Sequence, residues 1–240
     1  MNWNPGTPEP EPRAVPYFEL KKGELNFPPA HFADLDGLLA VGGDMSAERL
    51  LLAYQNGLYY WHHPMKHVKW WSPDPRIVLD TRSAPAPSPG MQGGFTTASN
   101  KDPEALLRLC QQHYNQEGTM TPAWLSERMF RIFMELGERG LVHAQEVWKE
   151  GQLVGGFFGV CLGGLCFGEY AVETVPGAAS CAILGAAGEL AARGVHLMDM
   201  QKETARGDQL PYDEVSRVAF VDLCRVAAEA CQREINRDPL

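Results

Sequence analysis

The sequence predicts an α+β protein built from a small N-terminal α/β domain and a larger C-terminal domain. Its 240 residues are 45% hydrophobic and 21% charged, which is ordinary for a globular protein and leaves room for a small domain beside a larger one. Apolar residues follow helical spacing in several segments up to about residue 140, and strand-like segments divided by glycine turns come next. The stretch WWSPDPR marks the expected boundary, so we expect domains at 17–75 and 76–240.

The first domain is expected to follow a flexible tail and to contain one clear helix. Residues 1–16 include five prolines, a composition typical of a mobile segment. A short helix is predicted over 44–57, where either Asp44 or Ser46 can cap the first turn and Gly57 supplies the left-handed stop.

A loop and two helices open the second domain. Residues 80–100 are rich in proline, glycine and serine and predict a loop. A helix is expected over 102–114, with Pro103 in its first turn, where a missing N–H does no harm. A second helix is expected to start near Pro122 and to close at Gly140.

Three consecutive strands are predicted between residues 141 and 173. Glycine turns at 150–151 and 163–164 divide this apolar segment, and strands joined by tight turns pair antiparallel. A helix, a strand and a last helix are expected to follow, at 180–194, 195–201 and 212–233. This order of elements resembles the core of an N-acetyltransferase-like (GNAT/FemX-like) fold.

The paired tryptophans of WWSPDPR raise the question of what this stretch does. Pro73 and Pro75 fix two backbone angles, and Asp74 suits the turn between them. We expect Trp70 and Trp71 to seal the seam between the two domains, with direct contact to an RNA as the alternative.

Charge and hydropathy exclude several classes of function. The net charge of −9 and the pI of about 5.3 argue against non-specific binding to a nucleic-acid backbone. A local patch of Lys66, Lys69 and Arg76 could still contact one end of an RNA, but charges on a solvated face are the favoured interpretation. The N-terminus lacks the features of a secretory signal, and the longest apolar run, 153–167, is too short to span a bilayer. We expect a cytoplasmic monomer with no membrane contact.

Neither the cysteines nor the histidines suggest a metal site. The six cysteines contain no C-x-x-C pair and mostly fall in apolar stretches, so we expect buried free thiols. His62, His63 and His67 are close in sequence, but no cysteine or carboxylate cluster joins them locally. We therefore expect no metal.

The strand LMDMQ is the most informative place for chemistry. Asp199 and Gln201 are two residues apart, so on a strand both would point to the same face. One interpretation is a pair bonded to neighbouring backbone at a strand end. The other is a base with a relay or oxyanion donor, a combination suited to acyl transfer.

Glu169 is the second candidate, because it follows Gly168 where an apolar strand reaches its end. It is either a solvated strand end or a site group. The sequence contains no G-x-S-x-G elbow, P-loop or H-E-x-x-H motif. An acyl-CoA N-acyltransferase is a further hypothesis that the fold allows, but TVPGAAS is a poor substitute for the pyrophosphate loop that such enzymes place before the helix.

Several motifs together carry a family resemblance. DGLLAVGGDMSAERLLLAYQNGLYYW, followed by VKWWSPDPR, resembles the N-terminal signature of leucyl/phenylalanyl-tRNA–protein transferases. The similarity continues through HAQEVWKEGQLVGGFFGV, FGE and MDMQ, over about residues 25–220. The resemblance implies transfer of an amino acid from the 3′ end of an aminoacyl-tRNA to the N-terminal amine of an acceptor protein, without a cofactor, since the ester is already activated.

The resemblance also implies roles for particular residues. The D-x-Q pair of the family matches Asp199 and Gln201, which would orient the amine, remove its proton and stabilise the oxyanion. The substrate-binding residues that it implies are Glu169 for the donor's α-amino group, Trp61 and Trp124 for the terminal adenosine, and Phe157 for the donor side chain. For both tryptophans the alternative is ordinary core packing.

The departures from the family pattern cluster near the expected substrate sites. The family's G-I-F-P-W-F is GLYYWHH here, G-E-S-M-F-S is GEYAVE, A-S-K is ASC, and H-x-x-S-L-G-A is RGDQLPY. Glu173 and Arg206 are either new polar contacts or solvated surface groups. The alternatives to the family reaction are another donor amino acid, a small-molecule amine as acceptor, or a catalytically silent module that binds the tRNA end.

Overall fold

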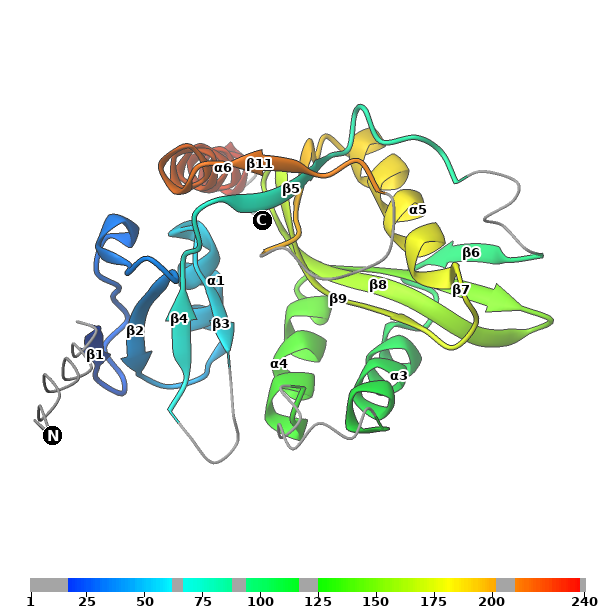
Figure 1. Cartoon of the computed structure of the whole chain (residues 1–240), viewed down its shortest axis with the longest axis horizontal. Coiled ribbons are helices and arrows are strands. Elements are labelled where there is room, and N and C mark those ends of the chain that lie inside the picture. The colour runs from blue at the N-terminus through cyan, green and yellow to red at the C-terminus, as the bar shows by residue number, and fades with distance from the viewer. Residues whose placement is uncertain (1–16, 62–66, 88–93, 117–124, 202–209, 238–240) are drawn as a thin grey trace, which may run out of the picture.

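A computed structural model of the chain describes residues 17–61, 67–87, 94–116, 125–201 and 210–237. Two β-sheets divide the described chain (Figure 1). The N-terminal sheet has four strands in the order β1-β2-β4-β3, in which only β1 and β2 are parallel. Its strands are β1 (Phe18–Leu20), β2 (Leu38–Gly42), β3 (Tyr59–Trp61) and β4 (Lys69–Trp71).

The second sheet has seven strands in the order β11-β5-β10-β9-β8-β7-β6. Only β9 and β10 run parallel, and the predicted meander of β7, β8 and β9 is confirmed. Glu150, Gly151 and Gly163 have positive φ angles in the turns between these strands. The strands are β5 (Arg76–Asp80), β6 (Thr96–Ser99), β7 (Val142–Lys149), β8 (Gln152–Leu162), β9 (Leu165–Glu173), β10 (Leu197–Asp199) and β11 (Asp213–Val215).

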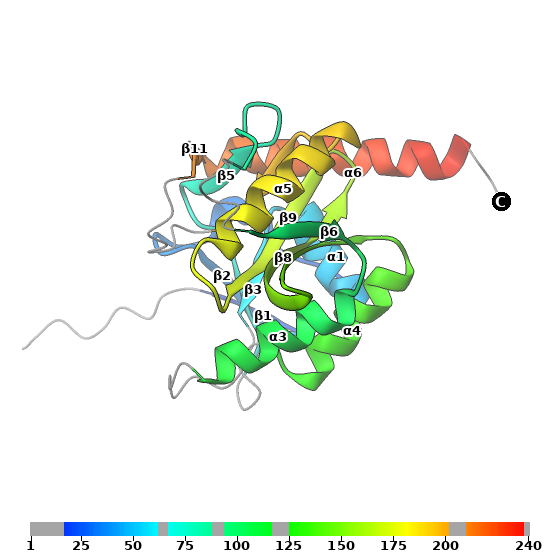
Figure 2. The ribbon, with the colours of Figure 1, turned by 90° about the vertical axis from the view of Figure 1, so that its right-hand side faces the viewer.

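Helices cover both faces of the seven-stranded sheet, and the chain is α+β as predicted. Figure 1 shows α5 on one face and α3 and α4 on the other. Helix α6 lies against α1, and in Figure 2 its C-terminal end projects from the body of the protein. No helix in the described ranges is long and apolar enough to cross a membrane. The helices are α1 (Ala47–Gln55), α3 (Pro103–Gln116), α4 (Glu127–Glu138), α5 (Ala178–Ala192) and α6 (Arg217–Arg237), with a 3-10 turn at Ala30–Phe32.

Three sequence predictions of element bounds are wrong in detail. Helix α4 begins at Glu127 rather than near Pro122, because Ser126 accepts a hydrogen bond from the backbone N–H of Met129 and caps the helix there. The predicted loop at 80–100 contains strand β6, which pairs with β7 at the sheet edge. The segment before α6 forms strand β11, so this helix starts at Arg217 rather than at 212.

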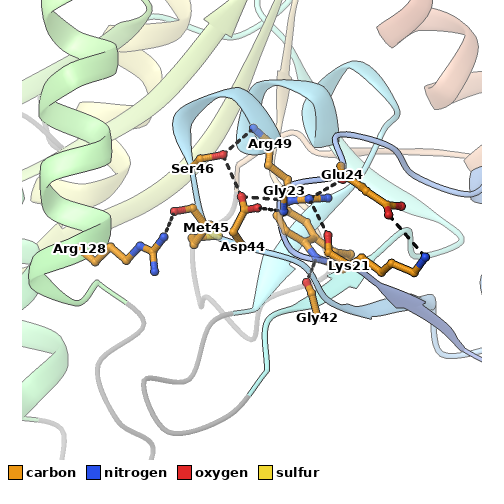
Figure 3. Close-up of polar contacts among 10 residues, drawn as sticks. Lys21, Gly23, Glu24, Gly42, Asp44, Met45, Ser46, Arg49 and Arg128 are labelled. Carbon is orange, nitrogen blue, oxygen red and sulfur yellow. Dashed lines mark hydrogen bonds and ion pairs between the residues drawn. The ribbon is translucent and has the colours of Figure 1, made fainter.

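A buried arginine fixes the start of α1, as Figure 3 shows. Arg49 is fully buried, and its guanidinium donates to the backbone oxygens of Lys21 and Glu24 and to Oδ1 of Asp44. Ser46 caps the helix, which resolves the alternative left open by the sequence, while Asp44 accepts from the backbone N–H of Gly23 instead. These bonds tie the loop after β1 to α1.

Helix α4 is also tied to this region. Arg128 donates to the backbone oxygen of Met45 at 2.6 Å, directly before α1 (Figure 3). Helix α1 is therefore fixed by contacts with the loop after β1 and with helix α4. This matters because α1 carries Tyr54 toward the candidate site.

Trp70 of the stretch WWSPDPR packs in the core. Its ring lies edge-on to Phe27, and its Nε1 donates to the backbone oxygen of Gly42. It belongs to a core cluster that contains residues of both sheets, and the sealing of the seam by Trp70 and Trp71 stays a prediction. Arg217 of α6 also connects the two parts of the chain, because it donates to the backbone oxygens of Ala33, Asp34 and Ser72.

Most of the described cysteine side chains are buried free thiols, as predicted. Cys110, Cys166, Cys181 and Cys224 are buried, and Cys161 is half-buried. The side chain of Cys231 lies outside the described part, and so do His62 and His63.

Candidate functional site

The candidate site lies where β9 and β10 part. The two parallel strands stay paired as far as Asp199, which lies opposite Phe167. After Asp199 the chain continues beside β5, since the backbone N–H of Met200 donates to the oxygen of Ile77. The predicted acid, amide and carboxylate come together at this point, where the Gln201 side chain reaches Gly168 of β9.

Asp199 is buried and paired on both oxygens. The Arg76 guanidinium donates from Nε to Oδ1 at 2.7 Å and from Nη2 to Oδ2 at 2.6 Å, and both side chains are 1% exposed. Planar bidentate contact of this kind fixes the orientation of the carboxylate. The prediction that Arg76 belongs to a solvated basic patch is wrong, because its side chain is buried and its charge is paired with that of Asp199.

Arg76 is itself held from several elements. Its guanidinium lies over the rings of Tyr59 and Phe220, at 5.1 and 4.6 Å from their centroids. Its Nη1 donates to the backbone oxygen of Gly57. The ion pair thus joins β5 and β10 to the end of α1 and to α6, and it sits at the junction of the two sheets.

Gln201 lies beyond the end of β10 rather than on it, which corrects the prediction that it shares a strand face with Asp199. It has φ of +67°, a left-handed conformation that is uncommon outside glycine. Its backbone N–H donates to Oδ1 of Asp199 at 2.8 Å, and its Nε2 donates to the backbone oxygen of Gly168 at 2.8 Å. Because a carbonyl can only accept, this contact assigns the amide orientation and leaves Oε1 as an acceptor for another group.

Glu169 sits at a β-bulge in β9. Gly159 of β8 pairs with Gly168 and Phe158 pairs with Tyr170, so Glu169 is the extra residue between them. A bulge redirects a side chain relative to the regular alternation of the strand. The half-buried carboxylate is thereby aimed toward the N-terminal sheet.

Two tyrosines meet the Glu169 carboxylate. The Tyr54 hydroxyl donates to Oε1 at 2.5 Å, and the Tyr60 hydroxyl donates to Oε2 at 3.2 Å. Burial raises the pKa of Glu169 to about 7, against the two tyrosine hydrogen bonds, which lower it. The group therefore titrates near neutral pH. Tyr54 is positioned by stacking on Phe167, at 4.6 Å between ring centroids.

Phe157 lies directly behind this site. A Cβ added at Gly168 would come within 3.1 Å of the Phe157 ring and 2.8 Å of the Asp199 backbone oxygen. Gly168 is thus required by close packing, and Phe157, which is 1% exposed, is an immediate neighbour of the site. The structure brings together Phe157, Glu169, Asp199 and Gln201.

The two predicted adenosine-binding tryptophans are less defined. Trp61 ends β3, where its backbone pairs with Lys69, but its side chain lies outside the described part. Trp124 precedes α4 and lies wholly outside the described residues. Arg206, from the altered segment 206–212, lies outside them as well.

Glu173 caps helix α5. Its Oε2 accepts hydrogen bonds from the backbone N–H groups of Gly177 and Ala179, at 3.1 and 3.0 Å. These groups belong to the first turn of α5, where an anion is favoured by the helix dipole. The helix end where an acyl-CoA enzyme would bind pyrophosphate thus holds a carboxylate of the chain itself.

Three residues of this site were not predicted from the sequence to be site residues. The sequence places Arg76 at the end of WWSPDPR and in a basic patch with Lys66 and Lys69, and no local pattern points to Asp199 as its partner. Tyr54 and Tyr60 lay in an apolar helix face and a turn-strand segment, where their rings suggested packing. A tyrosine hydroxyl in such a position has to find a polar partner when it is buried, and that was the available signal.

The chain is similar in sequence to proteins of one family. Family models described as the leucyl/phenylalanyl-tRNA protein transferase and its N-terminal domain match residues 90–225 and 43–74. A leucyl/phenylalanyl-tRNA–protein transferase from Hydrogenovibrio crunogenus is 35% identical over 223 residues, covering 90% of this chain and 85% of its own. One from Syntrophotalea carbinolica is 36% identical over 217 residues, covering 89% and 93%.

Solved structures give a more distant likeness. A GCN5-related N-acetyltransferase from Kribbella flavida aligns with 74% of this chain and 63% of its own, at 14% identity and a TM-score of 0.42. The residues that the two family models match include Tyr54, Tyr60, Phe157, Glu169, Asp199 and Gln201. The chain belongs to the leucyl/phenylalanyl-tRNA protein transferase family.

Proposed function

We propose that this chain transfers an amino acid, leucine or phenylalanine by the family's default, from the 3′ end of an aminoacyl-tRNA to the N-terminal amine of an acceptor protein. The amine nitrogen attacks the ester carbonyl, a peptide bond forms, and the bond to the ribose oxygen breaks. The amine loses a proton and the ribose oxygen gains one. The observation that carries the proposal is the convergence of Glu169, Gln201 and the Asp199–Arg76 pair where β9 and β10 part.

Glu169 is the group that would hold the donor's free α-ammonium. It is half-buried, so an ion pair there is only partly screened by water, and its bulge aims it away from the regular strand face. Tyr54 and Tyr60 each use one of its oxygens as an acceptor and leave further lone pairs for a cation. A carboxylate fixed in this way would orient the ester carbonyl relative to Gln201.

Gln201 is the group that would face the attacking amine. Its Nε2 already donates a hydrogen bond to the backbone oxygen of Gly168. Its Oε1 can therefore accept a hydrogen bond from an N–H of the amine and align the nitrogen lone pair with the carbonyl carbon. Because the ester needs no further activation, alignment of the reacting atoms is the main way in which an enzyme lowers the barrier of this reaction.

Asp199 would act through Gln201 as a positioning residue. Both of its oxygens already accept from Arg76, and Oδ1 also accepts from the Gln201 backbone, so little capacity is left for taking a proton from substrate. Its role is then to hold Gln201 in the left-handed conformation from which its amide reaches Gly168 of β9.

The remaining contacts follow from the family resemblance. Trp61 and Trp124 would stack on the terminal adenosine, an interaction worth about 1–3 kcal/mol per base. Phe157 would line the pocket of the donor side chain. If Trp61 stacks in this way, Trp61→Ala raises the donor KM, and an unchanged donor KM would contradict this role.

The organisation of the chain fits the proposal. We divide it into a small domain at 17–75 and a catalytic domain at 76–240, supported by the separation of the two sheets between Trp71 and Arg76. Action as a monomer is part of the proposal. Because the donor is aminoacyl-tRNA, the place of action would be the cytoplasm.

The test is a screen of individually charged tRNAs against a peptide with N-terminal arginine and against amines from a cell extract. Transfer of leucine or phenylalanine to the peptide is the expected result. Transfer of another amino acid, or transfer to a small amine, would revise the donor or the acceptor. Binding of the tRNA end without transfer to anything would contradict the proposed reaction and favour a silent module.

A further inference from the structure

The two oxygens of Glu169 are held from two different elements. Tyr54 belongs to α1 and donates to Oε1, whereas Tyr60 belongs to β3 and donates to Oε2. Tyr60 occupies the fourth position of GLYYW, where the family motif G-I-F-P-W has proline. Proline offers neither a hydroxyl nor an N–H, so the second hydrogen bond to the carboxylate is a feature of this chain.

We propose that Tyr60 is a positioning residue of the donor site, whose hydroxyl holds the Glu169 carboxylate in the orientation that receives the donor's α-ammonium group. The inference rests on the proposed function, in which Glu169 binds that group. It adds a specific role to a position at which the chain departs from its family.

The position of Tyr60 is rigid enough for this role. The residue is 7% exposed, and its backbone pairs directly with that of Trp70 in β4. The two rings lie 6.4 Å apart between centroids, so the phenol is packed from the side of the N-terminal sheet. A long glutamate side chain loses rotamer freedom when both of its oxygens are bound, and a ligand that needs one orientation gains from that restriction.

The charge state of Glu169 gives the inference a measurable consequence. The groups that face it are Tyr54 from α1, Tyr60 from β3, Arg76 from β5 and Asp199 from β10. Burial raises the pKa of Glu169 to about 7, while the hydrogen bond from Tyr60 lowers it. Removing that hydroxyl should raise the pKa further, so less carboxylate is ionised at neutral pH and the ammonium binds more weakly.

Tyr60→Phe is the central variant, because it removes the hydroxyl and keeps the ring. Transfer kinetics would be measured against donor concentration from pH 6 to 9. We expect kcat/KM for the donor to rise from pH 6 as Glu169 ionises and to fall again at higher pH as the donor ammonium loses its proton. The rising limb of the variant should be displaced to higher pH, and the falling limb should be unchanged. At pH 7 we expect its donor KM to increase about tenfold, the value typical for loss of a hydrogen bond to a charged group.

Tyr60→Pro restores the residue of the family motif and should displace the profile in the same direction. Tyr17→Phe is the control, since Tyr17 is 48% exposed and precedes β1, and it should keep the wild-type profile. A Tyr60→Phe profile with an unmoved pH dependence, even at reduced activity, would overturn the inference and leave Tyr60 as a packing residue.

A second measurement does not depend on turnover. Titration of carbon-13-labelled glutamate carboxyls by NMR should give a higher midpoint for Glu169 in Tyr60→Phe than in the wild type. An equal midpoint overturns the inference. Wild-type protein that transfers nothing contradicts the proposed function instead, so the two failures are distinguishable.

Discussion

The buried pair of Arg76 and Asp199 gives the sharpest prediction. In Asp199→Asn the new side chain has one oxygen and one NH₂ group, so in either orientation an amide donor meets a donor of Arg76. The guanidinium then stays buried, at 1% exposure, without its counter-ion. Removing one partner of a buried ion pair costs about 3–5 kcal/mol. For a chain of this size that corresponds to a fall in Tm of roughly 6–20 °C.

Urea and thermal unfolding, followed by circular dichroism, would measure this loss. Asp80→Asn is a matched control on β5, the strand that carries Arg76. Asp80 also accepts two bonds from one guanidinium, that of Arg82, at 3.0 and 2.7 Å, but the Arg82 side chain is 64% exposed. Exposed ion pairs contribute little, so Asp80→Asn should unfold close to the wild type.

A double variant separates stability from activity. Arg76→Met with Asp199→Leu replaces both charges by apolar groups and should recover most of the stability, since buried pairs are often replaceable in this way. It should still lack transfer activity, because Gln201 loses the oxygen that its backbone N–H contacts. Wild-type stability in Asp199→Asn, or wild-type transfer rates in the double variant, would refute this reasoning.

Three further predictions concern neighbouring residues. Gly168→Ala should lower the stability of the fold by about 1–3 kcal/mol and should also lower kcat, because the added Cβ meets the Phe157 ring and the Asp199 backbone. Urea unfolding and single-turnover transfer would measure the two effects. A fully active and stable variant would contradict this packing. Gln201→Ala should abolish transfer while the unfolding midpoint stays near that of the wild type, and wild-type rates would remove Gln201 from the mechanism. Glu173→Ala should destabilise the fold by about 0.5–2 kcal/mol, because α5 loses its cap. Donor specificity in the tRNA screen should be unchanged. Altered specificity would show that Glu173 contacts the substrate.

The departures from the family pattern now have different meanings. Glu173 serves α5 and Tyr60 contacts Glu169, so one altered residue supports the scaffold and the other reaches the site. Ala171 pairs in register with Phe157 across β8 and β9, beside the proposed donor pocket. Of these positions, Ala171 is the one from which a changed donor preference would arise, because Tyr60 acts on the carboxylate that receives the α-ammonium group common to every donor.

The sequence predicted local structure well where the signal was local. The turns at 150–151 and 163–164 are marked by glycine, which tolerates positive φ, and they divided the meander correctly. Helix α3 was predicted from its proline start and apolar spacing. Helix α4 began later than expected, because the cap at Ser126 outweighed a proline signal upstream.

The site was predicted only in part, for a physical reason. Asp199, Gln201 and Glu169 stood out because polar groups at the ends of apolar strands are costly to bury without partners. Their partners come from far along the chain: Arg76 lies 123 residues before Asp199, and Tyr54 lies 115 residues before Glu169. No spacing within the sequence predicts contacts between residues so far apart.

The sequence by itself determined the elements, the α+β class and the family, because side-chain periodicity, turn chemistry and contiguous motifs are all local properties. Only the tertiary structure decided what each polar group does. Packing of α1 and β5 against the end of β9 and β10 turned Arg76 from an expected surface charge into the counter-ion of Asp199. The same packing brought Tyr54 and Tyr60 to Glu169, because a buried charge or hydroxyl is stable only where a partner from another element reaches it.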